Sequence, residues 1–133
     1  MPTLTPSPLL RQALLADAAT SAACGLLMLA TAGPLSGLLG LPVELLRIAG
    51  AILLPFAAFI AYLALRQQLA RPVVWGVILV NVLWAADSVL LLAGGWLAPT
   101  RAGYAFVIAQ ALAVLMYADL QYRGIRRSSA VAA

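Results

Sequence analysis

The chain alternates between long apolar stretches and short breaks that are polar or rich in glycine and proline. Each apolar stretch reaches the roughly 20 residues that a helix needs to cross the hydrocarbon of a bilayer. Because the breaks are short, consecutive helices should lie next to each other. The pattern predicts an all-α integral membrane protein, a four-helix transmembrane bundle with up-down-up-down topology, whose helices cover about residues 9–32, 44–66, 72–94 and 101–122.

These four helices form one transmembrane domain, residues 9–123, flanked by two tails. Residues 1–8 are polar and proline-rich and are expected to be a disordered cytoplasmic tail, and residues 124–133 a basic cytoplasmic tail. The connection at residues 33–43 is almost entirely apolar, which favours a half-buried turn of helix in the membrane interface. The link at residues 67–71 is short and polar, so the second and third helices should be antiparallel neighbours.

The first apolar segment has a second interpretation, as a signal peptide. Arg11 would then belong to the basic region, and Ala30-Thr31-Ala32 has the form of a cleavage site. Against this, Asp17 interrupts the apolar run, and the run is long enough to span a membrane. These two points favour a retained helix.

Composition agrees with a membrane protein. The chain is 65% hydrophobic and 9% charged, with a mean hydropathy of +1.04, whereas a soluble domain has about 25% charged residues. It has no histidine and one cysteine, which removes the commonest general base and most metal ligands. We therefore expect no enzyme activity, no metal and no cofactor. No basic patch interleaved with aromatic residues occurs, so we expect no nucleic-acid partner.

Arginine placement predicts the orientation. All basic residues are arginine, and an Ala/Leu/Arg bias is typical of GC-rich bacterial genomes. The side of the bundle with the two tails and the 67–71 link carries six arginines: Arg11, Arg66, Arg71, Arg123, Arg126 and Arg127. The opposite side carries two, Arg47 and Arg101. Arginine and lysine near the ends of membrane-spanning helices are enriched on the cytoplasmic side. The expected location is the bacterial inner membrane, multi-pass, with both termini cytoplasmic.

The first helix carries a stripe of small and polar residues. Its members follow helical spacing and so share one face: Asp17, Ser21, Cys24, Gly25 and Met28. Such a face packs closely against neighbouring helices. Alternatively it lines a pathway, with Asp17 as a proton or cation site. In the packing interpretation Asp17 is expected to reach a cytoplasmic-side arginine: Arg66, Arg71 or Arg123.

The third helix carries two separate polar faces. Asn81 shares one with Ala85 and Ser88, so we expect it to point inward. Pro55, central in the second helix, should kink that helix and free the carbonyl of Ala51, to which Asn81 is expected to donate.

Asp87 lies about 120° from Asn81, on a face with Gly76, Leu83 and Gly94. An aspartate at a helix centre costs about 2.5–3.5 kcal/mol on insertion scales. Two solutions are expected: Asp87 pairs with Arg47 or Arg101, or it is protonated and titrates.

The fourth helix places Gln110 near its middle, on a stripe with Gly103, Tyr117 and Gln121. Gln110 is expected to be a second amide inside the bundle. Trp84 lies near the middle of the third helix, and its side chain either faces lipid or fills space between the helices. A shift of 64 residues aligns Asp17 with Asn81, which indicates two duplicated helical hairpins as one interpretation.

In size and helix number the chain resembles the small multidrug resistance exporters and the fluoride channels. Asp17 stands roughly where the exporters carry a first-helix glutamate, but the surrounding pattern is absent, so that role is not transferred. The run from Leu15 to Ala64 (LADAATSAACGLLMLATAGPLSGLLGLPVELLRIAGAILLPFAAFIAYLA) is more similar to a group of small, uncharacterised bacterial inner-membrane proteins. This resemblance covers most of the first two helices and implies no activity.

Two functions remain open. The first is a structural or accessory role in a membrane complex or homo-oligomer, with the bilayer and other membrane proteins as partners. The second is a small proton- or ion-linked transporter or channel that uses Asp17 and Asp87. They differ in whether a cavity reaches an aspartate, and in whether each aspartate has a partner within the protein.

Overall fold

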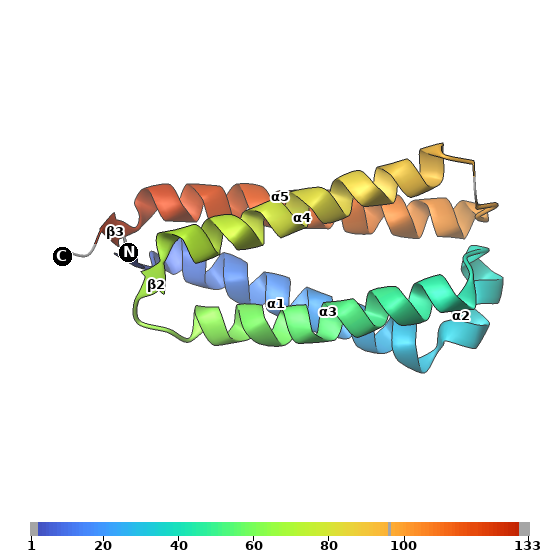
Figure 1. Cartoon of the computed structure of the whole chain (residues 1–133), viewed down its shortest axis with the longest axis horizontal. Helices are drawn as coiled ribbons and strands as arrows, with labels where there is room; N and C mark the ends of the chain where they lie inside the picture. The colour runs from blue at the N-terminus through green and yellow to red at the C-terminus, as the bar shows by residue number, and fades with distance from the viewer. Residues whose placement is uncertain (1–2, 96, 131–133) are drawn as a thin grey trace.

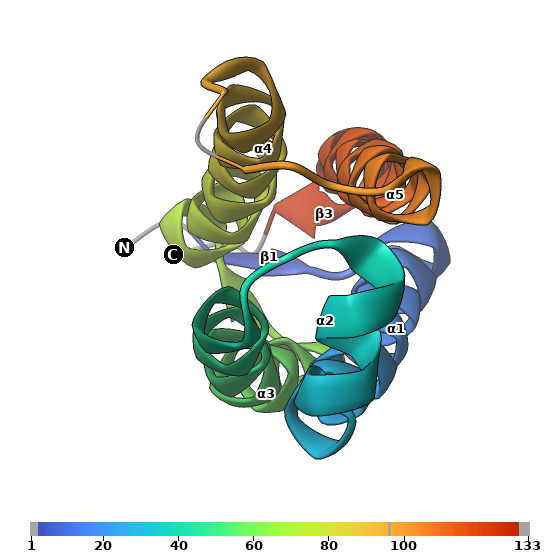
Figure 2. The same cartoon turned by 90° about the vertical axis from the view of Figure 1, so that its right-hand side faces the viewer.

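Five helices make up almost all of the part of the chain that this computed structural model describes, residues 3–95 and 97–130. Four are long and apolar enough to cross a membrane: α1 (Pro8–Ala30), α3 (Val43–Ala64), α4 (Arg71–Ala93) and α5 (Arg101–Arg127). They lie side by side along the molecule (Figure 1) and occupy four corners when viewed from one end (Figure 2). The fifth, α2 (Ala32–Leu39), is the short helix expected in the apolar connection.

The helix ends follow from local chemistry. Ser7 caps α1, because its hydroxyl accepts a hydrogen bond from the backbone N–H of Leu10 at 3.2 Å, and Pro8 occupies the first turn. Thr100 caps α5 in the same way, accepting from the N–H of Gly103 at 3.1 Å. Helix α5 continues to Arg127, five residues beyond the expected end at 122. Two arginines in its last turn complement the negative end of the helix dipole.

The residues before α1 are not the disordered tail that the sequence suggested. Thr3–Thr5 form strand β1, which pairs antiparallel with β2 (Leu69–Ala70) on one side and β3 (Ser129–Ala130) on the other. The Ser7 hydroxyl also donates to the carbonyl of Gly124 at 2.8 Å. This small sheet ties the start of α1, the α3–α4 link and the end of α5 together. Residues 1–2 and 131–133 of the expected tails lie outside the described residues.

At the other end of the bundle, the two remaining connections are also joined. The backbone N–H of Thr100 donates to the carbonyl of Leu39 at 3.0 Å, and its hydroxyl donates to the carbonyl of Leu38 at 2.7 Å. The start of α5 therefore lies against the end of α2. Together with the sheet, these bonds fix which connections share each end of the bundle.

Helices α1 and α3 share the most extensive contact of any two helices, and two glycines bring their backbones together. A Cβ atom added to Gly50 would lie 2.8 Å from the carbonyl oxygen of Gly25, and one added to Gly25 would lie 3.1 Å from the carbonyl oxygen of Gly50. Close approach also joins α4 to α5 and α1 to α5, whereas α3 and α4 are separated mainly by side chains. At Gly25 the small-residue face of α1 thus packs directly against α3.

The outer surface of the bundle is apolar. In the most hydrophobic 18-residue window of each long helix, only 28–39% of the residues are buried inside the protein. Large side chains such as Leu79, Leu83 and Leu90 are more than half exposed. So large an apolar surface is unfavourable in water and is the surface that a bilayer covers. The fold therefore fits a multi-pass membrane protein.

Pro55 lies inside α3 at an exposed position and does not end the helix. The expected kink stays a prediction. The hydrogen bond expected near it is wrong, because the amide of Asn81 is used elsewhere.

Candidate functional site

The centre of the bundle holds one polar group of four side chains, Asp17, Ser21, Asn81 and Gln121, called the Asp17 cluster below. One carboxylate oxygen of Asp17, Oδ2, accepts from Asn81 Nδ2 at 2.8 Å and from Gln121 Nε2 at 2.7 Å. The other, Oδ1, accepts from Ser21 Oγ at 3.2 Å. Asn81 Nδ2 also donates to Gln121 Oε1 at 3.1 Å. The four side chains form a closed network across three helices.

Three helices supply these residues by ordinary helical spacing. Asp17 and Ser21 are one turn apart on α1, Asn81 lies on the buried face of α4 with Ala85, and Gln121 lies in the last third of α5. Their side chains are excluded from the surroundings, since Asp17 and Gln121 are 0% exposed and Asn81 is 1% exposed. Burial of this degree is tolerated because both oxygens of the Asp17 carboxylate and both amide nitrogens are hydrogen-bonded within the cluster.

No arginine takes part in the Asp17 cluster. The expected contact of Asp17 with Arg66, Arg71 or Arg123 is wrong. Among the residues that the structure describes, no arginine nitrogen lies within 4.0 Å of the Asp17 carboxylate, and Arg123 pairs instead with Asp119 at 3.1 Å. The amides of Asn81 and Gln121 replace the cation. Amide donors satisfy the carboxylate without bringing a second charge into the bundle.

Apolar side chains close the bundle on the side of the Asp17 cluster that faces the sheet. Several of them are fully buried: Leu10, Leu14, Ile60 and Val74. They belong to a continuous core that also includes Leu4 of β1. This core separates the cluster from the end of the bundle that holds the sheet.

On the opposite side of the cluster the packing is looser. A cavity of about 40 Å³ touches Ser21 and Asn81. A second cavity, of about 70 Å³, lies further along between all four long helices and touches Cys24, Trp84 and Gln110. Both are lined almost entirely by apolar side chains, and neither is lined by Asp17 itself.

A second polar network lies beside these cavities. The indole Nε1 of Trp84 donates to Gln110 Oε1 at 2.6 Å, and Gln110 Nε2 donates to Ser88 Oγ at 2.8 Å. Ser88 in turn donates to the backbone carbonyl of Trp84 at 2.8 Å. Gln110 thus joins α5 to α4, and Trp84 is a packing residue with a bonded polar end.

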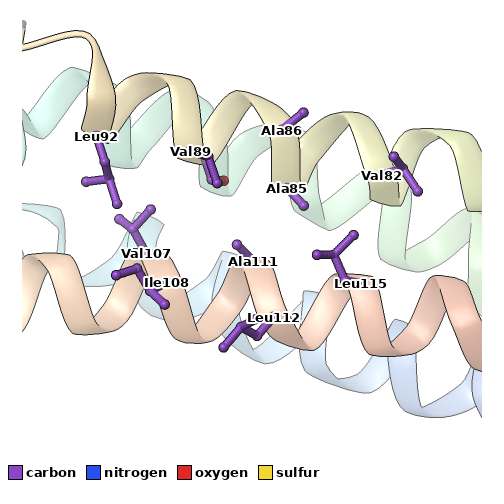
Figure 3. A pocket seen from close by; sticks show the side chains of 11 residues that line it. Val82, Ala85, Ala86, Val89, Leu92, Val107, Ile108, Ala111, Leu112 and Leu115 are labelled. Atoms are coloured by element: carbon purple, nitrogen blue, oxygen red, sulfur yellow. The ribbon is translucent and has the colours of Figure 1, made fainter.

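Between α4 and α5 the surface is hollowed into an apolar groove of about 320 Å³. Figure 3 shows Val89 and Leu92 of α4 and Val107 and Leu115 of α5 directed toward the space between the two helices. Ser88 is the one polar residue in its lining, and its hydroxyl is already bonded. The groove offers apolar contact and no polar recognition.

Asp87 stands apart from all of these features. It is exposed on α4, away from the buried face that carries Asn81, and among the described residues it has neither a hydrogen bond nor a salt bridge. Its expected pairing with Arg47 or Arg101 does not occur within the chain, because Arg47 lies 3.8 Å from Glu44 and Arg101 forms no salt bridge with a described residue. The sequence therefore predicted correctly that Asn81 and Asp87 lie on different faces of α4. The ion pair that it predicted for Asp87 within the chain is wrong.

Gln121 is the member of the Asp17 cluster that the sequence did not single out as a candidate site residue. It was placed on the stripe of Gln110 but treated as the edge of the fourth helix, one residue before its expected end. Because α5 continues to Arg127, Gln121 lies inside the bundle. A basic helix end beyond it was the available signal.

No protein-family model, curated protein or solved structure matches this chain. The class that the fold defines is a helical protein with four candidate membrane spans and a bonded polar cluster in its core.

Proposed function

We propose that this chain is a structural or accessory subunit of the bacterial cytoplasmic membrane, which acts in a complex or a homo-oligomer. It crosses the membrane four times in up-down-up-down order, and both termini face the cytoplasm. The arginine bias supports this orientation. Contacts near the sheet end are typical of a headgroup boundary, since the ring centroids of Trp75 and Tyr122 are 5.6 Å apart and the guanidinium of Arg126 lies 5.9 Å from the centre of the Tyr122 ring.

The observation that carries the structural role is the closure of the Asp17 cluster. In a conduit, a polar group in the core must be free to exchange its partners for a substrate or water. Here the Asp17 carboxylate is enclosed by three donors, and within the described residues no buried side-chain nitrogen or oxygen lacks a partner. The apolar core on the sheet side adds a second barrier. The cluster therefore holds α1, α4 and α5 in register.

One observation favours the transporter as the second candidate. The cavities of about 40 and 70 Å³ approach the Asp17 cluster from the end away from the sheet, and the smaller one touches Ser21 and Asn81. Asp87 lies outside both cavities. Transport would therefore depend on Asp17 alone, reached from one side of the membrane.

Flux measurements on reconstituted protein separate the two functions. Proton and sodium fluxes into liposomes that contain the wild-type chain should equal those into protein-free liposomes, and Asp17→Asn should change neither. A wild-type flux that Asp17→Asn abolishes, while its melting temperature is unchanged, would overturn the structural role. In a parallel arm, chemical crosslinking in native membranes should give adducts larger than the 13.9 kDa monomer, and a purely monomeric pattern would contradict the proposal.

A further inference from the structure

Asp87 is a charged group on a surface that otherwise fits lipid. It lies six residues before the end of α4 at Ala93, and therefore about 9 Å inside the helix end at 1.5 Å per residue. Its neighbours on that face, Leu83 and Leu90, are 51% and 61% exposed. A long cationic side chain can extend to water from such a depth, but an aspartate is too short to do so. The ion-pair solution for Asp87 therefore needs a cation from outside its own chain.

Arg47 is the matching charge. It lies four residues after the start of α3 at Val43, about 6 Å inside that helix end. The end of α4 and the start of α3 are on the same side of the bundle, because Thr100, just before α5, is bonded to Leu39, just before α3. The depths of Arg47 and Asp87 thus differ by about 3 Å, which the flexible arginine side chain can span.

Arg47 is also available. Its side chain is 58% exposed, and its one salt bridge is a long contact of 3.8 Å to Glu44, which is 80% exposed. Exposed pairs of this kind contribute little to stability. Arg101 is a weaker match, because it is the first residue of α5 and lies at the helix end.

We propose that Asp87 of one copy pairs with Arg47 of a second copy, so that the chain assembles as a homo-oligomer through α4 of one protomer and α3 of the next. This inference rests on the structural role proposed above and identifies the binding partner as a second copy of the same chain. The arginine bias gives every copy the same orientation, which keeps the two charges at one depth. Away from water their attraction is strong.

The contact joins two different surfaces, one on α4 and one on α3. Made once between two copies it is heterologous and generates a ring when the rotation between copies closes, and made twice across a two-fold axis it gives a dimer. A symmetric contact of α4 with α4 would instead bring two Asp87 carboxylates together at membrane depth, where their repulsion is least screened.

A charge swap tests the pairing in full-length protein reconstituted in liposomes. Oligomer size is measured by photobleaching steps of labelled protein, with chain folding followed by thermal melting. The single variants Asp87→Arg and Arg47→Asp should each lower the oligomeric fraction at least tenfold, because like charges then meet. The double variant should restore it to within twofold of wild type. Asp119→Arg, an exposed site at the other end of the bundle, is the matched control and should leave assembly unchanged.

Cysteine crosslinking keeps the test valid if a swapped variant fails to fold. In a Cys24→Ser background, copies with Asp87→Cys and copies with Arg47→Cys should form a mixed disulfide when co-expressed, and Asp87→Cys alone should not. A disulfide between two copies of Asp87→Cys, or single-swap losses that the double variant does not restore, would overturn the pairing. If crosslinked adducts contain another membrane protein and no second copy, the pairing fails while the structural role stands. An Asp17-dependent ion flux would instead refute the structural role itself.

Discussion

Replacing Asp17 by asparagine should leave the bundle intact, whereas replacing it by alanine should not. In the Asp17→Asn variant the side-chain carbonyl oxygen can take the place of Oδ2 and still accept from Asn81 and Gln121. Its amide then takes the place of Oδ1 and donates to the hydroxyl of Ser21, which reverses its role from donor to acceptor. All three hydrogen bonds survive in this variant.

The Asp17→Ala variant loses the three bonds and leaves two amides with unpaired donors. The two bonds to α4 and α5 are each expected to contribute about 0.6 kcal/mol, by comparison with other interhelical bonds in membranes. Leaving buried donors without acceptors costs about 1–3 kcal/mol more. Together these terms give a loss of about 2–4 kcal/mol for Asp17→Ala, and a change near zero or a small gain for Asp17→Asn.

Cys24 supplies the assay. It is the chain's one cysteine and is partly buried between helices, so a thiol-reactive fluorescent dye reports unfolding without an engineered label. Melting in mild detergent should place Asp17→Asn at or above wild type and Asp17→Ala clearly below it. If Asp17→Asn is as unstable as Asp17→Ala, the charge itself holds the bundle, and the hydrogen-bond argument for a structural cluster is wrong.

Three further predictions concern packing, the second network and orientation. Gly50→Ala should cost about 1–3 kcal/mol in the same melting assay, because its Cβ would overlap the carbonyl of Gly25, whereas Gly76→Ala, with no atom within 4 Å of its added Cβ, should be neutral or stabilising; equal losses would contradict the close α1–α3 contact. A double-mutant cycle of Trp84→Phe and Gln110→Leu should give a coupling energy of about 0.6–1.7 kcal/mol, and additive effects would show that the bond of 2.6 Å contributes nothing. Alkaline phosphatase should be active when inserted in the α4–α5 connection and inactive when fused at the C-terminus, and the reverse pattern would place the termini outside.

The number and approximate positions of the four long apolar helices follow from the sequence alone, because an apolar run of sufficient length specifies a helix through its backbone hydrogen bonds. The faces of α4 follow for the same reason. Helical spacing separates Asn81, Ala85 and Ser88 from Asp87, and the structure buries the first three and exposes the fourth. These properties depend on residues only a few positions apart.

Partners across helices were decided by the tertiary structure. Asp17 meets Asn81 and Gln121, which are 64 and 104 residues away, and the encounter depends on the depth and rotation of three helices. The strand at Thr3–Thr5 has the same origin, since its partners are distant segments that the bundle brings together. A local pattern fixes which side of a helix is polar. Which residues meet on that side is set by packing. The sequence therefore specified four long apolar helices, and the fold decided the bonding of Asp17 and the isolation of Asp87.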